Sequence, residues 1–590
     1  MTDAPTGPAF NIHDIPFSTY GSWFDISPVT AERTRATDLY LVSHKSGMHP
    51  VLRLVALAGP HGERIETHWS ATPGQLRWTD RDRYIELTYQ APDILRLRGA
   101  GLSLQVIAGA QQLTPFSGTF FLHDPVDGSY VFTSYETGRR YRVTVLAGQA
   151  ADVRGRETLG TAHRGLTLTA APNGGVWEAA IEELDSARTP YAPSGTYEQV
   201  ATRADQAFTR FADAVAPWRT ADTPAAELAA YVVWSATVRP AGFLGRPAVL
   251  MSKHWMDKVW SWDHCFNALA LAPGAPDLAW DQFQVMFDHQ DESGALPDSV
   301  THSEILYNFV KPPVHGWALG RLRQRLGRPL THAELTETYR RLERWTTFWL
   351  TARRVPGQVL PYYQHGNDSG WDNATTFDPG RLQTTADLSA FLVLQLHELA
   401  DLADELGLGE QARSWSLSAD TIQAAMIDQL WTGDRFQARS PHTGQATSSL
   451  GLLDLMPIVL GEHLPADIST RLAAHIETHL TAHGLATEHP DSPHYQADGY
   501  WRGPIWAPVT VLIEDGLRRA GHHHLADEIS TRFRGLCETS GFAENFDALT
   551  GEGLRDRAYT WTASSYLLLA EDHTTRSHPQ NEGQRSALHR

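Results

Sequence analysis

The chain has 590 residues, 42% of them hydrophobic and 20% charged, a balance that excludes wholesale disorder and predicts more than one domain. Its formal net charge of −19 disfavours partners bound through phosphates, so we expect no nucleic-acid partner. No apolar run approaches the ~20 residues of a membrane-spanning helix, the N-terminus lacks a signal-peptide pattern, and two cysteines cannot form a disulfide framework. These features predict a cytoplasmic protein with no membrane partner.

Residues 1–197 are predicted to form an antiparallel β-sandwich domain. Short runs with alternating polar and apolar residues recur between glycine, proline and aspartate turns, for example at 51–55, 84–89, 94–97, 102–107 and 141–145. Such alternation is typical of strands with one face on a core, and two sheets are needed to bury it.

From residue 198 the hydrophobic period changes to 3.6, which predicts helices as far as residue 572. Thr331 and Glu334 form a capping-box pattern before one of them, and another is expected to end at Gly407. About a dozen such segments without convincing strands favour a closed double ring of helices, an (α/α)6 barrel. The polar residues 573–590 are predicted to be a mobile tail.

Four segments interrupt the helical pattern with aromatic and acidic residues. The first, KHWMDKVWSWDHCFN at 253–267, carries Trp260, Trp262 and Asp263. One tryptophan can be a core residue, but several mixed with lysine and aspartate are typical of a sugar pocket, in which aromatic faces stack on pyranose rings. A tryptophan-rich packing face remains the alternative.

The second segment, at about 352–383, contains GNDSGWDNATTF and links two helices by some thirty residues. Connections of that length are usually functional or disordered, and the aromatic residues argue against disorder. Its two carboxylates, Asp368 and Asp372, are candidates for chemistry, with a turn or helix cap as the alternative, especially for Asp368.

The third and fourth segments are YWRGPIWAP from Tyr500 and FAENFDALTGEG from Phe542. Arg502 could fork onto vicinal hydroxyls or keep a carboxylate ionised. In the last segment Glu544, Asp547 and Glu552 are equally placed by position alone. Two separated carboxylates among tryptophans suit glycoside hydrolysis, which needs one acid and one base or nucleophile.

No metal site is predicted, because the His522–His524 triplet lacks spaced cysteine or carboxylate partners. We expect no cofactor, although a structural Ca²⁺ stays open.

These motifs resemble glycoside hydrolase family 63, whose members are inverting α-glucosidases and mannosylglycerate or glucosylglycerate hydrolases. The similar residues are WSWDHCFNALA from Trp260, KPP at 311–313, SGWDN at 369–373, and the two segments from Tyr500 and Phe542. The resemblance implies that Asp372 is the general acid, Glu544 the general base and Asp263 a sugar-binding residue. It further implies that the pocket is lined by Trp260, Trp371, Trp501, Arg502, Trp506, Lys311 and Gln290.

The implied reaction is a single displacement by an exo-acting, inverting α-glycosidase. Asp372 is expected to have a pKa raised by its aromatic surroundings and Glu544 to stay ionised, with about 6.5–9.5 Å between the carboxyls. The long N-terminal region favours an α-glucosidase acting on short α-linked oligosaccharides. Alternatives are a glucosylglycerate or mannosylglycerate hydrolase, whose acidic substrate would face Lys253, Lys258 or Arg502, a catalytically silent carbohydrate-binding protein, and a phosphorylase.

Overall fold

The structure is a computed structural model that describes residues 7–59, 62–154 and 159–577. The chain divides into two compact units. The first comprises Met1–Ala214, Ala230–Lys258 and Thr301–Glu304, and the second Val215–Ala229, Val259–Val300 and Ile305–Arg590. None of the helices in the described ranges combines the length and apolarity that crossing a bilayer requires.

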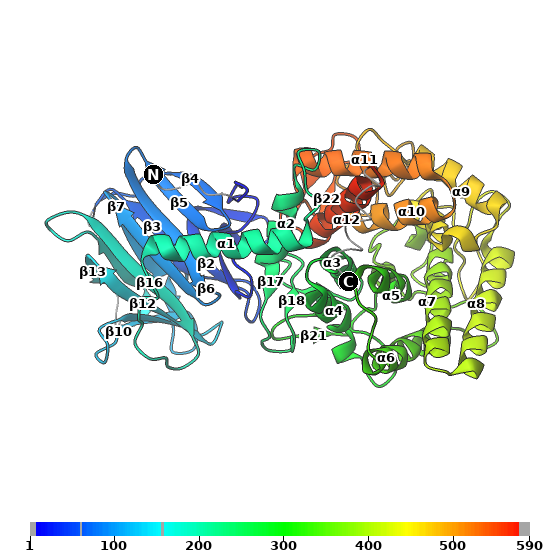
Figure 1. Ribbon diagram of the computed structural model, residues 1–590, viewed down its shortest axis with the longest axis horizontal. Coiled ribbons are helices and arrows are strands. Elements are labelled where there is room, and N and C mark those ends of the chain that lie inside the picture. Colours follow the sequence, from blue (N-terminus) through cyan, green and yellow to red (C-terminus); the bar gives the residue numbers. More distant parts are fainter. Residues whose placement is uncertain (1–6, 60–61, 155–158, 578–590) are drawn as a thin grey trace. The chain divides into compact units, whose positions relative to one another are not determined.

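The first unit is built from two large antiparallel sheets, as the alternating pattern predicts (Figure 1). The six-stranded sheet has the order β1 (Phe24–Ala31), β2 (Thr34–Ser43), β3 (His49–Leu57), β8 (Ser103–Ala108), β15 (Gly165–Thr169), β13 (Gln149–Arg154). The eight-stranded sheet has the order β10 (Thr119–His123), β11 (Tyr130–Ser134), β12 (Arg139–Ala147), β16 (Val176–Leu184), β7 (Ile94–Ala100), β6 (Arg83–Ala91), β5 (Gln75–Asp80), β4 (His68–Thr72). Leu41, Leu54, Leu87 and Phe132 are among the fully buried residues that form its core.

The unit boundary lies later than the predicted residue 197, because the sheets do not account for all of the first unit. Most of helix α1 (Tyr197–Val215) and the segment Ala230–Lys258 also belong to it. Within that segment Lys253 donates hydrogen bonds to the Ser18 hydroxyl (3.0 Å) and the Ser22 carbonyl (2.7 Å), which ties it to the N-terminal residues.

The second unit contains a closed ring of helices. Each of its members packs against the next and the last packs against the first, in the order α3 (Asp263–Leu271), α5 (His315–Arg325), α7 (Ala386–Glu405), η4 (Leu452–His463), α10 (Ala507–Arg519), α12 (Thr560–Ser577). A second layer lies against this ring: α4 (Pro276–Gln284), α6 (His332–Thr351), α8 (Gly409–Leu430), α9 (Ala466–Thr478), α11 (His523–Ser540). Figure 1 shows α8 outside α7 and α11 outside α10. This is the double ring expected from the helical periodicity.

Local signals explain where these helices begin and end. The capping box at the start of α6 is confirmed: the Thr331 hydroxyl accepts from the Glu334 backbone and the Glu334 carboxylate accepts from the Thr331 backbone. Gly407 follows α7 with φ +74°, a left-handed conformation that favours glycine. Helix α12 continues to Ser577, so 573–577 are not part of a tail; the rest of the predicted tail lies outside the described residues.

Candidate active site

The candidate residues of the four predicted segments come together within the second unit, whereas residues 253–258, which begin the first segment, belong to the first unit. Asp263 is the first residue of α3, and Trp260 precedes it on β19 (Val259–Trp260), which pairs with β20 (Ser299–Val300). Glu544 lies directly before β22 (Asn545–Phe546), whose Phe546 bridges Ile505 of the segment that leads into α10. A sheet edge and several loops thus supply the candidate residues, and the helices hold them.

Lys311 links three of the acids. Its ammonium nitrogen is 3.1 Å from an Asp298 oxygen and 4.0 Å from an Asp372 oxygen, and it donates a hydrogen bond to the Asn367 carbonyl (3.0 Å). Burial alone lowers the pKa of Lys311, but the carboxylates of Asp372, Asp298 and Asp263 outweigh burial and raise it. Lys311 is therefore a buried cation at the centre of an acidic cluster.

Glu544 is completely enclosed by the protein. It has no accessible surface, and neither carboxylate oxygen has a hydrogen-bond partner of ordinary geometry among the described residues. Burial raises the pKa of Glu544 to about 8; Asp556 raises it further, whereas Arg555 and Tyr500 lower it. Removal of water thus outweighs the one nearby guanidinium and works against the expected ionisation of Glu544, which must lose its proton before it can act as a base.

The pKa values of Asp372 and Asp263 are also raised. Desolvation raises the pKa of Asp372, and the Lys311 charge opposes that shift, while 29% of the Asp372 side chain remains accessible. Burial raises the pKa of Asp263 to about 8, against the lowering effect of Lys311. The direction of the Asp372 shift is the one that the sequence analysis expected.

Tyr500 shows that the three acids have a common neighbourhood. Burial raises the pKa of its phenol, and the charges of Glu544, Asp372 and Asp263 raise it further. Tyr500 adopts φ +66° and Arg555, whose guanidinium lies 4.9 Å from the Tyr500 ring, adopts φ +60°. Left-handed backbone is costly for such side chains, and strain of this kind concentrates at functional sites.

The predicted tryptophans form one packed cluster beside these acids. Trp501 stacks on Trp506 (centroids 4.0 Å apart, 3° between planes) and lies against Trp371 (4.9 Å) and Trp262 (6.3 Å). Each of these four is at most 3% exposed, whereas Trp260 is half-buried. The indole nitrogen of Trp501 has no hydrogen-bond partner among the described residues. The cluster therefore supplies a rigid wall, and direct sugar contact by its members stays a prediction.

A glycine requirement fixes the Asp372 loop against this wall. Gly370 has φ +74°, and a Cβ added there would lie 2.7 Å from the Trp262 indole. Any other residue would both strain the backbone and push Trp262 away. The SGWDN motif is thus needed for close packing as well as for its carboxylate.

Arg502 holds the same loop from the other side. It donates to the Asn373 carbonyl (2.7 Å) and pairs with Asp378, while the Asn373 side chain bonds the Gly499 carbonyl and the Trp501 amide (both 3.0 Å). These bonds join the second and third segments. They make Arg502 a positioning residue, since both of its observed partners belong to the loop.

Three other candidates are assigned by their contacts. Asp368 accepts from Arg353 (2.6 Å) and from the backbone amides of Val310 and Gln364, so it holds the loop in place through a buried ion pair and not as the turn or helix cap given as its alternative. Gln290 donates its amide protons to the carbonyls of Gly294 (2.8 Å) and Arg341 (3.0 Å), which stabilises its own loop. In the fourth segment, Asp547 caps a turn and Glu552 is exposed, which leaves Glu544 as the buried acid.

Sequence reasoning missed Asp298, Tyr559 and Arg555, and gave Tyr500 no role. Asp298 belongs to a short loop before β20 and carries no motif, and Tyr559 is a buried phenol beside α12. The charge of Glu544 raises the pKa of Tyr559, after burial as the main cause. Arg555 lies two residues after the quoted TGEG turn, so its position was the one available signal.

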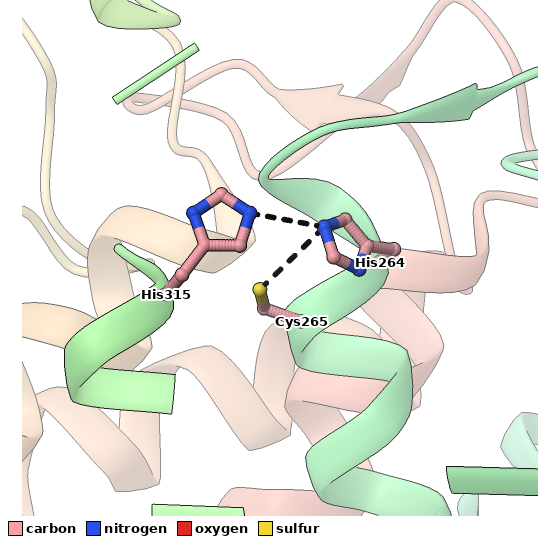
Figure 2. A group of neighbouring side chains, drawn as sticks. All are labelled: His264, Cys265 and His315. Atoms are coloured by element: carbon pink, nitrogen blue, oxygen red, sulfur yellow. Dashed lines mark hydrogen bonds between the residues drawn. The ribbon is translucent and has the colours of Figure 1, made fainter. Parts of the chain in front are cut away.

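His264 and Cys265 directly follow Asp263 in α3. Together with His315 they form a group whose metal-ligating atoms lie within 4.8 Å of one another (Figure 2). The Trp345 indole can only donate, so it donates to Nδ1 of His315 (3.2 Å). His315 then carries its proton on Nε2 and donates to Nε2 of His264 (3.2 Å), and His264 donates through Nδ1 to the Gln282 carbonyl (2.8 Å).

This relay requires two neutral imidazoles. Burial lowers the pKa of His264 to about 4 and places that of His315 well below its usual range. A neutral histidine that binds a metal through Nε2 carries its proton on Nδ1, where Trp345 already donates to His315. The hydrogen bonds thus favour a structural relay over a metal site and anchor the first turn of α3, where Asp263 is located.

One stability prediction follows from Asp263. Its pKa in the folded state is raised from about 4 to about 8, so the native state binds a proton that the unfolded state has lost, and its contribution to stability declines as pH rises through that window. Asp263→Asn cannot ionise, so the melting temperature of the variant relative to the original protein should increase from pH 5 to pH 8. The same substitution at exposed Asp277 is the control; equal differences for Asp263→Asn at both pH values would contradict the argument.

Comparison with known proteins agrees with this geometry. Residues 256–562, more than half of the chain, match the family described as the mannosylglycerate hydrolase MGH1-like glycoside hydrolase domain. A mannosylglycerate hydrolase from Rubrobacter radiotolerans is 25% identical over 397 residues, which cover 52% of this chain and 89% of the relative. A glucosylglycerate hydrolase from Mycolicibacterium hassiacum is 23% identical over 443 residues, covering 58% and 97%.

Among solved structures, the crystal structure of a family 63 mannosylglycerate hydrolase from Thermus thermophilus in complex with glucose is similar in fold. The TM-score is 0.51 at 19% identity, over 58% of this chain and 98% of that one. The fold of the helical ring, the arrangement of its acidic residues and the family match lead to one conclusion: the chain belongs to the MGH1-like glycoside hydrolases of family 63 and is a glycoside hydrolase.

Proposed function

We propose that the enzyme is an exo-acting, inverting α-glycosidase whose substrate is a small glycoside of a hydroxy acid, mannosylglycerate or glucosylglycerate. The relatives named as hydrolases of these compounds support this substrate class over short α-glucosides. The sequence favoured an α-glucosidase over a glycerate glycoside hydrolase, and the relatives reverse that order of preference. The N-terminal region that favoured an α-glucosidase lies outside the residues matched by the family, so its length says nothing about the pocket.

The acid and base are assigned from one observation, the difference in exposure between the two carboxyls. In an exo-acting pocket the aglycone leaves toward solvent, so the group that protonates the leaving oxygen belongs on the accessible side. Asp372 is 29% exposed, whereas Glu544 is fully buried. We therefore assign Asp372 as the general acid and Glu544 as the general base at the closed end.

The reaction is then a single displacement. The Asp372 proton passes to the glycosidic oxygen as the bond from that oxygen to the anomeric carbon breaks, and the aglycone leaves as an alcohol. A water opposite the aglycone attacks the anomeric carbon and gives a proton to the Glu544 carboxylate, so the reactive form of the enzyme is the one in which Glu544 has lost its proton and Asp372 has kept its own. An α-glycoside thus yields the β-sugar first. The separation of about 6.5–9.5 Å between the carboxyls stays a prediction.

The cations expected for the glycerate carboxylate need revision. Lys253 is fully buried and bonded to Ser18 and Ser22, and Arg502 is bonded to the Asp372 loop, so both are engaged. Lys311 and Arg555 differ in that their charges act on the catalytic acids, although both are mostly buried and each is paired, Lys311 with Asp298 and Arg555 with Asp498. The carboxylate of an acidic aglycone would have to pair with one of these two cations.

The test of this function is a substrate screen with proton NMR of the first-formed anomer. Mannosylglycerate, glucosylglycerate and α-linked disaccharides of glucose and mannose are compared by kcat/KM in buffer without phosphate. The proposal expects the highest value for a glycerate glycoside and initial release of the β-anomer. Highest activity on a disaccharide would restore the α-glucosidase alternative, initial release of the α-anomer would rule out inversion, and turnover only with added phosphate would indicate a phosphorylase.

Lys311 provides a separate prediction about pH dependence. Because its charge lowers the pKa of Asp372, Lys311→Met should raise that pKa and move the pH optimum of kcat/KM upward. Lys311→Arg keeps the charge and should leave the optimum in place, even where its larger side chain lowers kcat. An unchanged optimum in the methionine variant would show that Lys311 does not act on the catalytic acids.

A further inference from the structure

The first unit contains a pocket that the glycosidase function does not use. It has a volume of about 360 Å³ and is formed by strands β2 and β3 of the six-stranded sheet, β4 and β5 of the eight-stranded sheet, and the N-terminal residues 11–13. All of its lining residues belong to the first unit, outside the segment 256–562 that the family match covers. Its size lies within the range of about 300–1,000 Å³ typical of small-molecule sites.

One wall of this pocket is aromatic. Trp69 on β4 and Trp78 on β5 are direct cross-strand partners, so their side chains share one face of the sheet. Trp78 is buried, whereas Trp69 is half-buried, and the His13 ring lies 5.0 Å from the Trp69 ring at 31°. The Trp69 indole donates to the Thr67 hydroxyl (3.0 Å), which fixes the ring. The pocket therefore presents a rigid, partly accessible aromatic surface.

The facing side is polar and preorganised. Asp38, on β2, is 6% exposed and accepts from Arg53 (2.6 Å) and from Nε of Arg64 (2.7 Å). Arg64 also donates to the Thr37 carbonyl (2.8 Å), and 35% of its side chain is accessible. These bonds use two of its five N–H donors and hold the guanidinium plane in place, which leaves donors for a ligand.

The charges of the pocket decide the ligand class. Asp38 is compensated by Arg53 and Arg64, and Glu66 adds a further negative charge at the wall, so there is no surplus of positive charge to attract an anion. An aromatic face and a planar set of donors and acceptors that line the same pocket suit a neutral ring with apolar faces and equatorial hydroxyls. A pyranose has both features.

We propose that this pocket binds a neutral pyranose of an α-linked glycan, so that the N-terminal unit is a carbohydrate-binding unit in its own right. The choice of a neutral pyranose depends on residues of the first unit alone, whereas the α-linkage rests on the proposed function. Glycan binding also gives a role to a region whose presence in the chain the substrate proposal leaves unexplained.

The test measures binding by the full-length Glu544→Gln variant, to avoid consumption of the ligand, with calorimetry and tryptophan fluorescence. The probes are maltooligosaccharides and α-mannooligosaccharides, with inorganic phosphate as the anionic comparison. Saturable binding to one of the glycans is expected, weakened at least about tenfold by Trp69→Ala and also by His13→Ala, as for loss of an aromatic anchor. Phe116→Ala, at a residue 86% exposed elsewhere in the same unit, should leave binding unchanged.

A second measurement separates this site from the catalytic one. In the otherwise unchanged protein, Trp69→Ala should not alter kcat/KM on a small glycoside. Should Trp69→Ala fail to fold, the His13→Ala and Arg64→Gln variants give the same comparison. Absence of saturable glycan binding, binding that survives all three substitutions, or binding of phosphate in preference to glycans would overturn the proposal.

Discussion

Asp372→Asn should lower kcat on a glycerate glycoside by about 10²–10⁴-fold, because asparagine has no proton to give to the leaving oxygen. The loss should be much smaller on the dinitrophenyl glycoside of the same sugar. Dinitrophenolate is a weak base and leaves without protonation, so that substrate bypasses the general acid. The measurement is the ratio of kcat values for variant and original protein on the two substrates.

This comparison also tests the assignment of the two roles. In the free protein Glu544, with a pKa of about 8, resembles an acid, and Asp372 interacts with the Lys311 cation. Electrostatics alone would thus permit Glu544 as the acid and Asp372 as the base. The greater exposure of the Asp372 side chain is the reason for the assignment made here. If the activated substrate rescues Glu544→Gln but not Asp372→Asn, the roles are exchanged. Thermal unfolding of each variant controls for loss of the fold.

Glu544→Gln should lose about 10²–10⁴-fold in kcat on both the natural and the activated substrate, since activation of the water is needed whatever the leaving group. Glu544→Ala should respond to azide, a small nucleophile that needs no base. Azide attack from the water side would replace the aglycone and give a β-glycosyl azide from an α-glycoside, which mass spectrometry and NMR identify. Glu552→Gln is the matched control, because Glu552 is an exposed acid in the same segment. An α-glycosyl azide, or no azide product with unimpaired folding, would contradict a base on the opposite face.

The sequence supports the fold and the identity of the acids to different degrees. Hydrophobic periodicity was sufficient to predict the two sheets and most helices, because an element that buries one face has apolar residues at the spacing of that face. It missed η4, a 3₁₀ segment with Pro457 inside it and a kink at Gly461, which is buried almost throughout, so no amphipathic pattern marks it. The unit boundary was also beyond reach, because it depends on contacts such as those of Lys253 with Ser18 and Ser22.

For the site, motif resemblance identified Asp263, Lys311, Asp372 and Glu544, which the structure brings into one electrostatic cluster. It could not show that Arg502 serves the backbone of the Asp372 loop, because hydrogen-bond partners depend on the tertiary structure. Nor could it give a direction for the pKa of Glu544, which depends on how completely water is removed. The backbone strain at Tyr500 has no signature in the sequence.

The closure of the helical ring bears on how the enzyme folds. Helix α12 packs against α3, so the contact that completes the ring joins residues nearly three hundred positions apart, and Asp263 and Glu544 lie on either side of that seam. Contacts of such high sequence separation carry a large loop-closure entropy and form late. During synthesis, the catalytic residues therefore assemble after α12 has emerged, and a nascent chain arrested before α12 should be inert however well its earlier helices have formed.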